Sequence, residues 1–278
     1  MEWLDALILG IVQGLAEYLP VSSSGQLEIC HQLLGLETSG AESLQFDITL
    51  HVATVLSTIV ILWREFSRIC TSVLTWRRDE DFVTFWKIVL SCIPVAIVGF
   101  AFKDVVESAY GGQLNIVGIC LLATAALLAF AYFTRTRPLI SRRGAIDSAS
   151  VGRPIGWLDA FIIGIAQAVA VLPGLSRSGS TIATGILLGN KREAVAKFSF
   201  LMVIIPILGE ALLDLIKILK GEELSAQIGM IPLLVGFFSA FVVGCLACQW
   251  MLNIVKRGKL VWFALYCLAT GVLCLIFG

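Results

Sequence analysis

Long apolar runs separated by short polar stretches fill almost the whole chain, and two of these runs are interrupted. About 20 helical residues cross the roughly 30 Å of hydrocarbon in a bilayer. The interrupted runs, residues 3–36 and 157–189, contain a proline followed by serine and glycine. We expect each to form a re-entrant helix hairpin, whose non-helical turn requires protein or a wet cavity around it. The runs of spanning length predict transmembrane helices over about residues 44–63, 85–102, 114–133, 198–219, 230–252 and 260–277.

The two interrupted runs are copies of one another. Residues 3–25 read WLDALILGIVQGLAEYLPVSSSG, and residues 157–179 read WLDAFIIGIAQAVAVLPGLSRSG. An internal repeat of this kind predicts two related halves. We place the first repeat at 1–134, a basic cytoplasmic linker at 135–156 and the second repeat at 157–278. The expected fold is an all-α membrane protein in which each half has one re-entrant hairpin and three transmembrane helices.

The positive charges fall in alternate loops. Arginine and lysine gather in residues 64–87, 134–156, 190–197 and 253–259, and cytoplasmic loops of membrane proteins carry such an excess. The predicted spans put all of these loops on one side, so both termini are expected outside. An odd number of crossings inverts the second half relative to the first, which lets the two polar tips meet near the midplane.

Composition supports the bilayer as the environment. Hydrophobic residues make up 58% of the 278 residues and charged residues 14%, against about 45–50% and 25% in soluble domains. The formal net charge of zero gives no electrostatic case for nucleic acid as a partner. Cys245 and Cys248 form a C-x-x-C pair inside an apolar run, where packing is favoured over redox or zinc chemistry.

The first tip carries an acid, and the second carries a base. Gln13 and Glu17 lie four residues apart and therefore share one helix face. An ionised carboxylate at membrane depth needs a partner or a wet cavity. Because no lysine or arginine precedes Arg64, we expect that partner to be Arg177 on the second tip.

Hydroxyl side chains begin the helix that follows each break. Helix N-termini bind phosphate through free N–H groups, and a guanidinium adds paired donors. Together they predict a phosphate or pyrophosphate site whose substrate-binding candidates are Ser22, Ser24, Gln26, Ser176, Ser178 and Thr181. A carboxylate would repel such an anion, so Glu17 indicates chemistry. It could be a general base or, with the substrate phosphates, a ligand of a divalent cation. Ser23 and water are alternative nucleophiles.

Structural roles compete with these interpretations. Ser23 and Gln26 match a capping box, and Glu17 with Arg177 could form an ion pair that only joins the halves. His51 lies in a predicted span and could approach the site, although a core role is favoured. His31 could shuttle protons.

At these residues the chain resembles the undecaprenyl pyrophosphate phosphatase family, membrane phosphatases linked to bacitracin resistance. The matching elements are (E/Q)-x-x-x-E ending at Glu17, PVSS at 20–23, PG-x-SRS-x-x-T at 173–181 and FSFL at 198–201. The resemblance covers essentially the whole chain. It implies release of the terminal phosphate from a polyprenyl pyrophosphate, which recycles the lipid carrier for cell-wall synthesis. It also implies a divalent cation, Mg²⁺ or Ca²⁺, and a site open to the outer face of the bacterial plasma (inner) membrane.

By position, the resemblance makes Glu17 the key carboxylate, assisted by Gln13. It assigns the pyrophosphate to Ser22, Ser23, Ser176, Arg177 and Thr181. Many members carry histidine where this chain has Gln26, and glutamine cannot act as an acid or base near neutral pH. A homodimer is compatible with this reading. The inverted repeat also suits a rival function, a translocase that flips a phosphorylated polyprenyl lipid without hydrolysing it.

Overall fold

Nearly all the named elements of this chain are helices. The computed structural model describes residues 1–36, 40–101, 114–136, 140–141, 144–145, 152–219 and 228–278. The exceptions to helix are two short strands of the linker, β1 (Ile140–Ser141) and β2 (Gly144–Ala145), which pair antiparallel. The helices are α1 (Trp3–Ala16), α2 (Ser23–Leu33), α3 (Gly40–Ile61), α4 (Trp63–Leu74), α5 (Glu80–Ala101), α7 (Leu114–Ala131) with the π-helical turn η1 (Tyr132–Thr136), α8 (Trp157–Val169), α9 (Arg177–Leu187), α10 (Arg192–Met202), α11 (Ile204–Leu219), α12 (Met230–Arg257) and α13 (Val261–Phe277). The predicted all-α class is confirmed.

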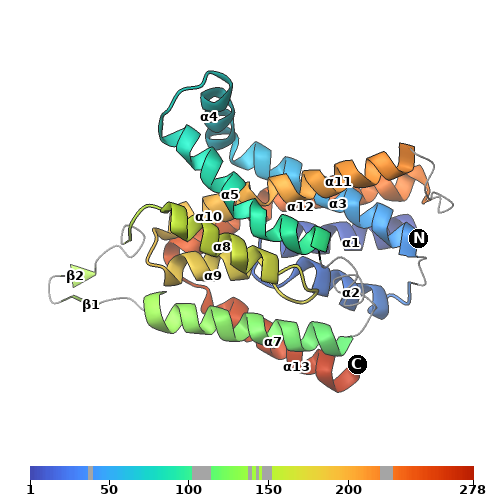
Figure 1. Ribbon diagram of the computed structural model, residues 1–278. Helices are drawn as coiled ribbons and strands as arrows, with labels where there is room; N and C mark the ends of the chain where they lie inside the picture. The colour runs from blue at the N-terminus through green and yellow to red at the C-terminus, as the bar shows by residue number, and fades with distance from the viewer. Residues whose placement is uncertain (37–39, 102–113, 137–139, 142–143, 146–151, 220–227) are drawn as a thin grey trace.

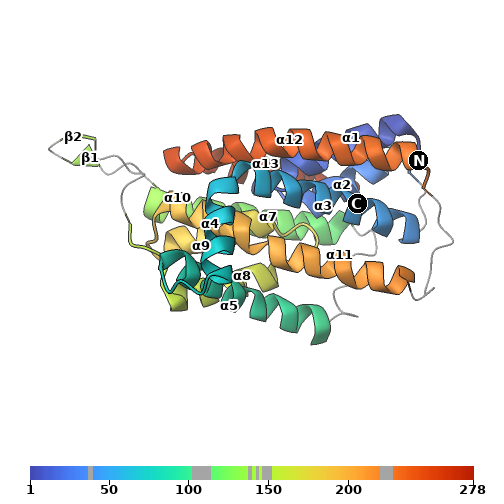
Figure 2. The ribbon, with the colours of Figure 1, turned by 90° about the horizontal axis from the view of Figure 1, so that it is seen from above.

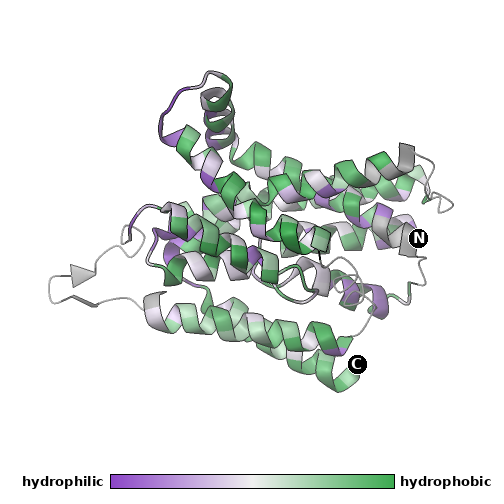
Figure 3. Ribbon diagram, in the orientation of Figure 1, coloured by the Kyte–Doolittle hydropathy of each residue, from purple (hydrophilic) through white to green (hydrophobic). Residues whose placement is uncertain are grey.

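Several of these helices are long and apolar enough to cross a membrane. Among the described residues they number 4: Glu80–Ala101, Leu114–Thr134, Arg192–Leu213 and Met230–Arg257. The bent pair α3 and α4 passes the same test together, and α1, α8 and α13 are shorter apolar helices. Figure 3 shows hydrophobic residues along the length of these helices. The chain is a multi-pass membrane protein.

The α3–α4 corner differs from the sequence-based prediction. The sequence predicts a polar loop from residue 64 onwards, whereas α4 occupies Trp63–Leu74 at 87° to the preceding helix. Figure 1 shows α4 projecting from the other helices. Trp63 and Leu74, at the two ends of α4, are exposed, and charged residues lie between them. Exposed apolar and charged side chains on one helix are expected of an amphipathic helix at a membrane surface. The loop prediction is wrong because these charges follow a helical period.

The broken helices α1–α2 and α8–α9 each pack against the opposite half of the chain. α1 packs on α12 and α8 packs on α5, whereas α7 and α13 pack on each other. Corresponding helices of the two repeats therefore make corresponding contacts. Both termini lie at one end of the helices, and the β1–β2 linker lies at the other (Figures 1 and 2).

Two glycines at equivalent positions of the repeat permit this close packing. A Cβ at Gly10 would lie 2.6 Å from the carbonyl oxygen of Gly236 on α12, and a Cβ at Gly164 would lie 2.4 Å from the carbonyl oxygen of Ser91 on α5. Small residues let membrane helices approach backbone to backbone. The repeated glycine therefore sets the distance between each hairpin and the span that supports it.

Gly164→Ala should destabilise the protein, because the carbonyl of Ser91 can move only if α5 moves. Overpacking of this kind costs about 1–3 kcal/mol. We expect the thermal unfolding midpoint in detergent to fall by several degrees. Gly99→Ala on α5 is the matched control, since in the described part of the chain no atom outside the adjoining helix backbone lies within 4 Å of its added Cβ. Equal midpoints for the two variants would contradict this account of the packing.

Candidate functional site

Ser22 caps the helix that follows the break in the first tip. α1 ends at Ala16, and the chain reverses over Glu17–Val21 before α2 begins. Ser22 has φ 66° and ψ 99°, and its hydroxyl accepts a hydrogen bond from the N–H of Gly25 at 3.3 Å. Such a positive φ is costly for a residue other than glycine and is most often found at functional sites. Because Ser22 is the capping residue, the capping-box interpretation of Ser23 and Gln26 is wrong.

Gln26 is held by the structure around it. Its amide nitrogen donates to the carbonyl oxygen of Val21 at 3.1 Å, and its amide oxygen accepts from the hydroxyl of Tyr266 on α13 at 2.8 Å. The thiol of the neighbouring Cys267 donates to the carbonyl oxygen of Pro20 at 3.3 Å. Helix α13 therefore fixes the position of the first tip through its contacts with Gln26 and Pro20.

The second tip repeats the same cap and touches the first. The Ser176 hydroxyl accepts from the N–H of Gly179 at 3.0 Å, so that Arg177 begins α9. The Ser178 hydroxyl donates to the carbonyl oxygen of Leu19 on the first tip at 3.1 Å. The repeat thus builds two capped helix starts that lie against one another.

Glu17 is the point where the two tips meet. One carboxylate oxygen lies 2.5 Å from Nη2 of Arg177, and the other accepts from Nε2 of Gln13 at 3.0 Å and from the Ser23 hydroxyl at 2.9 Å. The Glu17 side chain is 7% exposed and that of Arg177 is 27% exposed. The predicted pairing of acid and base across the repeat is therefore present, and Gln13 and Ser23 contact the same carboxylate.

His51 on α3 faces this carboxylate. Its Nε2 lies 3.8 Å from Oε2 of Glu17, and its Nδ1 lies 2.8 Å from the carbonyl oxygen of Asp47. A carbonyl only accepts hydrogen bonds, so in the neutral ring Nδ1 carries the proton and Nε2 presents a lone pair to Glu17. The structure therefore brings His51 to the site, the less favoured of the two expectations, because helical position alone does not reveal which helix a side chain faces.

Tyr18 and a row of hydroxyls on α3 form a neighbouring layer that sequence reasoning missed. The Tyr18 hydroxyl donates to the carbonyl oxygen of Thr54 at 2.6 Å and contacts the hydroxyls of Ser57 and Thr58. Its ring meets Phe200 edge to face at a centroid distance of 5.2 Å. The spacing of hydroxyl residues at 54, 57 and 58 in an apolar span is the signal that could have indicated this face.

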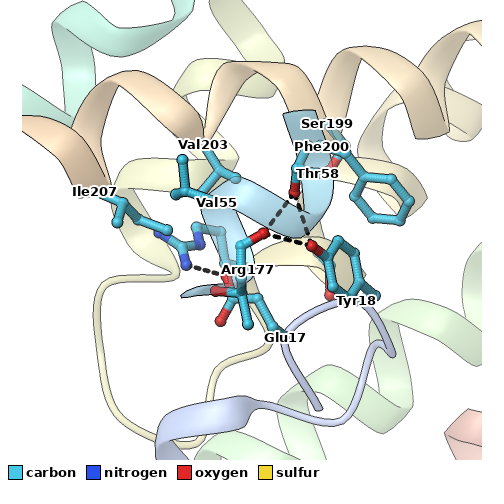
Figure 4. A pocket seen from close by; sticks show the side chains of 11 residues that line it. Glu17, Tyr18, Val55, Thr58, Arg177, Ser199, Phe200, Val203 and Ile207 are labelled. Carbon is cyan, nitrogen blue, oxygen red and sulfur yellow. Dashed lines mark hydrogen bonds and ion pairs between the residues drawn. The ribbon is translucent and has the colours of Figure 1, made fainter. Parts of the chain in front are cut away.

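A small cavity of about 10 Å³ lies between these groups. Figure 4 shows Glu17, Tyr18 and Arg177 around it, with apolar side chains from α3, α10 and α11. Thr181 is turned toward Ser199, with 2.6 Å between their hydroxyl oxygens. The remaining candidates lie within the tips, where Ser24 is 3.4 Å from Ser22 and Ser178 is 3.3 Å from Ser176, measured between hydroxyl oxygens.

Gln13 and Glu17 are the side chains at this site whose oxygen atoms a hard cation could use. Within the described part of the chain, no group of three or more His, Cys, Asp or Glu side chains could hold a metal. The buried Oε1 of Gln13 has no hydrogen-bond partner among those residues, and it belongs to the side chain that donates to Glu17. Mg²⁺ is usually bound through one or two carboxylates together with substrate phosphates; Glu17 could supply the carboxylate, and Gln13 could add an amide oxygen.

Fold and site together define a multi-pass membrane protein with a buried acid–base centre between two capped helix starts. The family model described as bacitracin resistance protein BacA matches residues 6–273, and the chain belongs to this family.

Relatives match the chain along its whole length. The undecaprenyl-diphosphatase of Parabacteroides distasonis is 54% identical over 98% of this chain and 97% of its own length. The undecaprenyl-diphosphatase of Bacteroides fragilis is 54% identical over 99% and 98%, respectively, and that of Christiangramia forsetii is 42% identical over 100% and 98%. The family indicated by the motifs is confirmed.

Proposed function

We propose that this protein is a membrane phosphatase that hydrolyses undecaprenyl diphosphate to undecaprenyl phosphate and inorganic phosphate. The single observation that carries the proposal is the Glu17 carboxylate, held between Arg177 and the Ser23 hydroxyl at the junction of two helix starts. The names of the full-length relatives support the substrate. The reaction would recycle the lipid carrier used in cell-wall synthesis. Translocation without hydrolysis is not favoured, since these relatives are named as hydrolases.

The diphosphate would bind beside the helix starts of α2 and α9. Backbone N–H groups and the positive ends of helix dipoles favour phosphate at such positions. Arg177 has further N–H donors besides the one directed at Glu17, so it can bind a phosphoryl oxygen as well. These donors would stabilise the charge that develops on the phosphoryl oxygens during transfer.

Glu17 would act as the general base. The hydrogen bond from Ser23 to Glu17 favours the serine hydroxyl as the group that it activates. The serine oxygen bonds to the terminal phosphorus, its proton passes to Glu17, and the bond from that phosphorus to the bridging oxygen breaks. Undecaprenyl phosphate leaves with the bonding electrons. Water then cleaves the phosphoserine, which releases phosphate and restores Ser23; direct attack by water is the alternative route.

His51 would receive the proton that Glu17 takes up. Its Nε2 lone pair faces the carboxylate, and the separation of 3.8 Å could be bridged by one water. A divalent cation, Mg²⁺ or Ca²⁺, would be held by Gln13 and Glu17 with the substrate phosphates. When bound, such a cation neutralises phosphate charge.

The proposed setting is the bacterial plasma (inner) membrane, with the repeats inverted and the site open to the outer face. The basic loops predict that the α4 end of the molecule is cytoplasmic. Both termini lie at the opposite end from the β1–β2 linker (Figure 1), which supports termini on the outer side.

Glu17→Gln and Arg177→Ala should each lower phosphate release from undecaprenyl diphosphate by at least about 100-fold in detergent with Mg²⁺ or Ca²⁺. The first variant removes the base, and the second removes the charge that stabilises the transition state. Glu80→Gln, at the exposed start of α5, should keep normal turnover. Full turnover by Glu17→Gln would refute this assignment. If the wild-type protein binds the lipid without releasing phosphate under any metal, the translocase becomes the better account.

His51→Gln should lower kcat about tenfold or more and change KM by less than about twofold. The reason is that His51 would accept the proton from Glu17 and would not contact the bound lipid. His31, the proposed alternative proton shuttle, forms no hydrogen bond or ion pair with Glu17 in the described part of the chain, so His31→Gln on α2 is the matched control. Steady-state kinetics at saturating metal separates the two parameters. A rise in KM with kcat unchanged would show that His51 contributes to binding instead.

A further inference from the structure

A second pocket lies at the corner between α3 and α4, away from the Glu17 centre. Its volume is about 410 Å³, and it is lined by the end of α3, the start of α4, one face of α10 and the last turns of α12. It shares no lining residue with the cavity at Glu17. Pockets of about 300–1,000 Å³ are typical of small-ligand sites.

Charged side chains line the polar wall of this corner pocket. Lys197 lies 2.8 Å from Glu65 and 3.0 Å from Glu193, and Lys256 lies 3.0 Å from Glu193. Arg64 also lines the pocket and is exposed; among the described residues it forms no ion pair. Three basic and two acidic side chains therefore leave one positive charge in surplus, and Arg64 is the group available to an incoming anion.

Exposed apolar side chains also line the corner pocket. Val60 is 53% exposed and Trp63 is 58% exposed, and both line the pocket beside Leu252. Tryptophan in membrane proteins is enriched at the depth of the headgroups. The corner pocket thus places exposed apolar side chains beside a cluster of charges, which is the combination that the acyl chains and the phosphate of a phospholipid need.

We propose that the corner pocket binds an anionic glycerophospholipid of the phosphatidylglycerol class. The phosphodiester carries one negative charge, which matches the surplus positive charge, and Arg64 would donate to its oxygens. Glu65, Gln249 and Asn253 also line the pocket and offer acceptors for the glycerol hydroxyls. The acyl chains would lie along Val60 and Trp63. Basic pockets between transmembrane helices are known to take anionic headgroups.

A lipid in this position would stabilise the packing of the helices around the corner pocket. It would contact α3 and α4 on one side and α10 and α12 on the other, so it joins elements of both repeats. A ligand that binds only the folded state raises stability in proportion to its concentration over its dissociation constant. This role goes beyond the proposed phosphatase and does not depend on turnover.

Native mass spectrometry and thermal unfolding of the delipidated full-length protein test the proposal. The probes are phosphatidylglycerol, phosphatidylethanolamine and phosphatidylcholine with identical acyl chains, and inorganic phosphate. We expect the wild-type protein to retain phosphatidylglycerol at least fivefold better than the other lipids and to unfold several degrees higher in its presence. Inorganic phosphate should not displace the lipid.

Arg64→Gln should abolish the preference for phosphatidylglycerol while the unfolding midpoint of the lipid-free protein stays unchanged. Arg257→Gln is the matched control. Arg257 is an exposed arginine in the last turn of α12, next to Lys256 of the pocket, and it does not itself line the pocket. Equal losses in both variants would refute a specific site and indicate general charge attraction. Equal retention of phosphatidylethanolamine, or displacement of the lipid by inorganic phosphate, would refute an anionic lipid as the ligand.

Discussion

The ion pair between Glu17 and Arg177 is the constraint on which the centre of this protein depends. Two charges at this depth cost several kcal/mol each to remove from water. Their attraction offsets this cost only when the two groups are in close contact and their remaining hydrogen-bonding atoms have partners. Here the contact is 2.5 Å, and Gln13 and Ser23 satisfy the second carboxylate oxygen. Because each half supplies one charge, neither hairpin can hold its own charge without the other.

The rest of the fold keeps these two tips in register. Gly10 and Gly164 bring each hairpin against a span of the opposite half. Tyr18 anchors the first tip to α3 through Thr54, and Tyr266 anchors it to α13 through Gln26. These buried hydrogen bonds fix positions that a surface loop could not hold. In a phosphatase, such preorganisation supplies much of the stabilisation of the transition state.

Two kinds of feature at this site can be predicted from the sequence: the segments that occur twice, and a charged residue that has no opposite charge near it in the sequence. The duplicated motif indicates two hairpins, and the lack of an earlier cation points from Glu17 to Arg177. The sequence leaves the position of His51 open between the site and the core, and it does not indicate the contact of Gln26 with Tyr266, since a helical period gives a face but not its neighbour. The bend at Leu62 is likewise invisible, because residues 60–64 contain neither proline nor glycine. Only the packed structure reveals which side chains from distant helices meet.

The central claim is that Glu17 performs chemistry and Arg177 binds the phosphate. The most direct test is the affinity of a non-hydrolysable methylene analogue of undecaprenyl diphosphate for the wild-type protein and for Glu17→Gln, measured without divalent cations. We expect the variant to bind the analogue about tenfold more tightly, since a repelling carboxylate is gone and Arg177 is released from it. Weaker binding by the variant would contradict the claim, because Glu17 would then contribute to holding the ligand rather than to its cleavage.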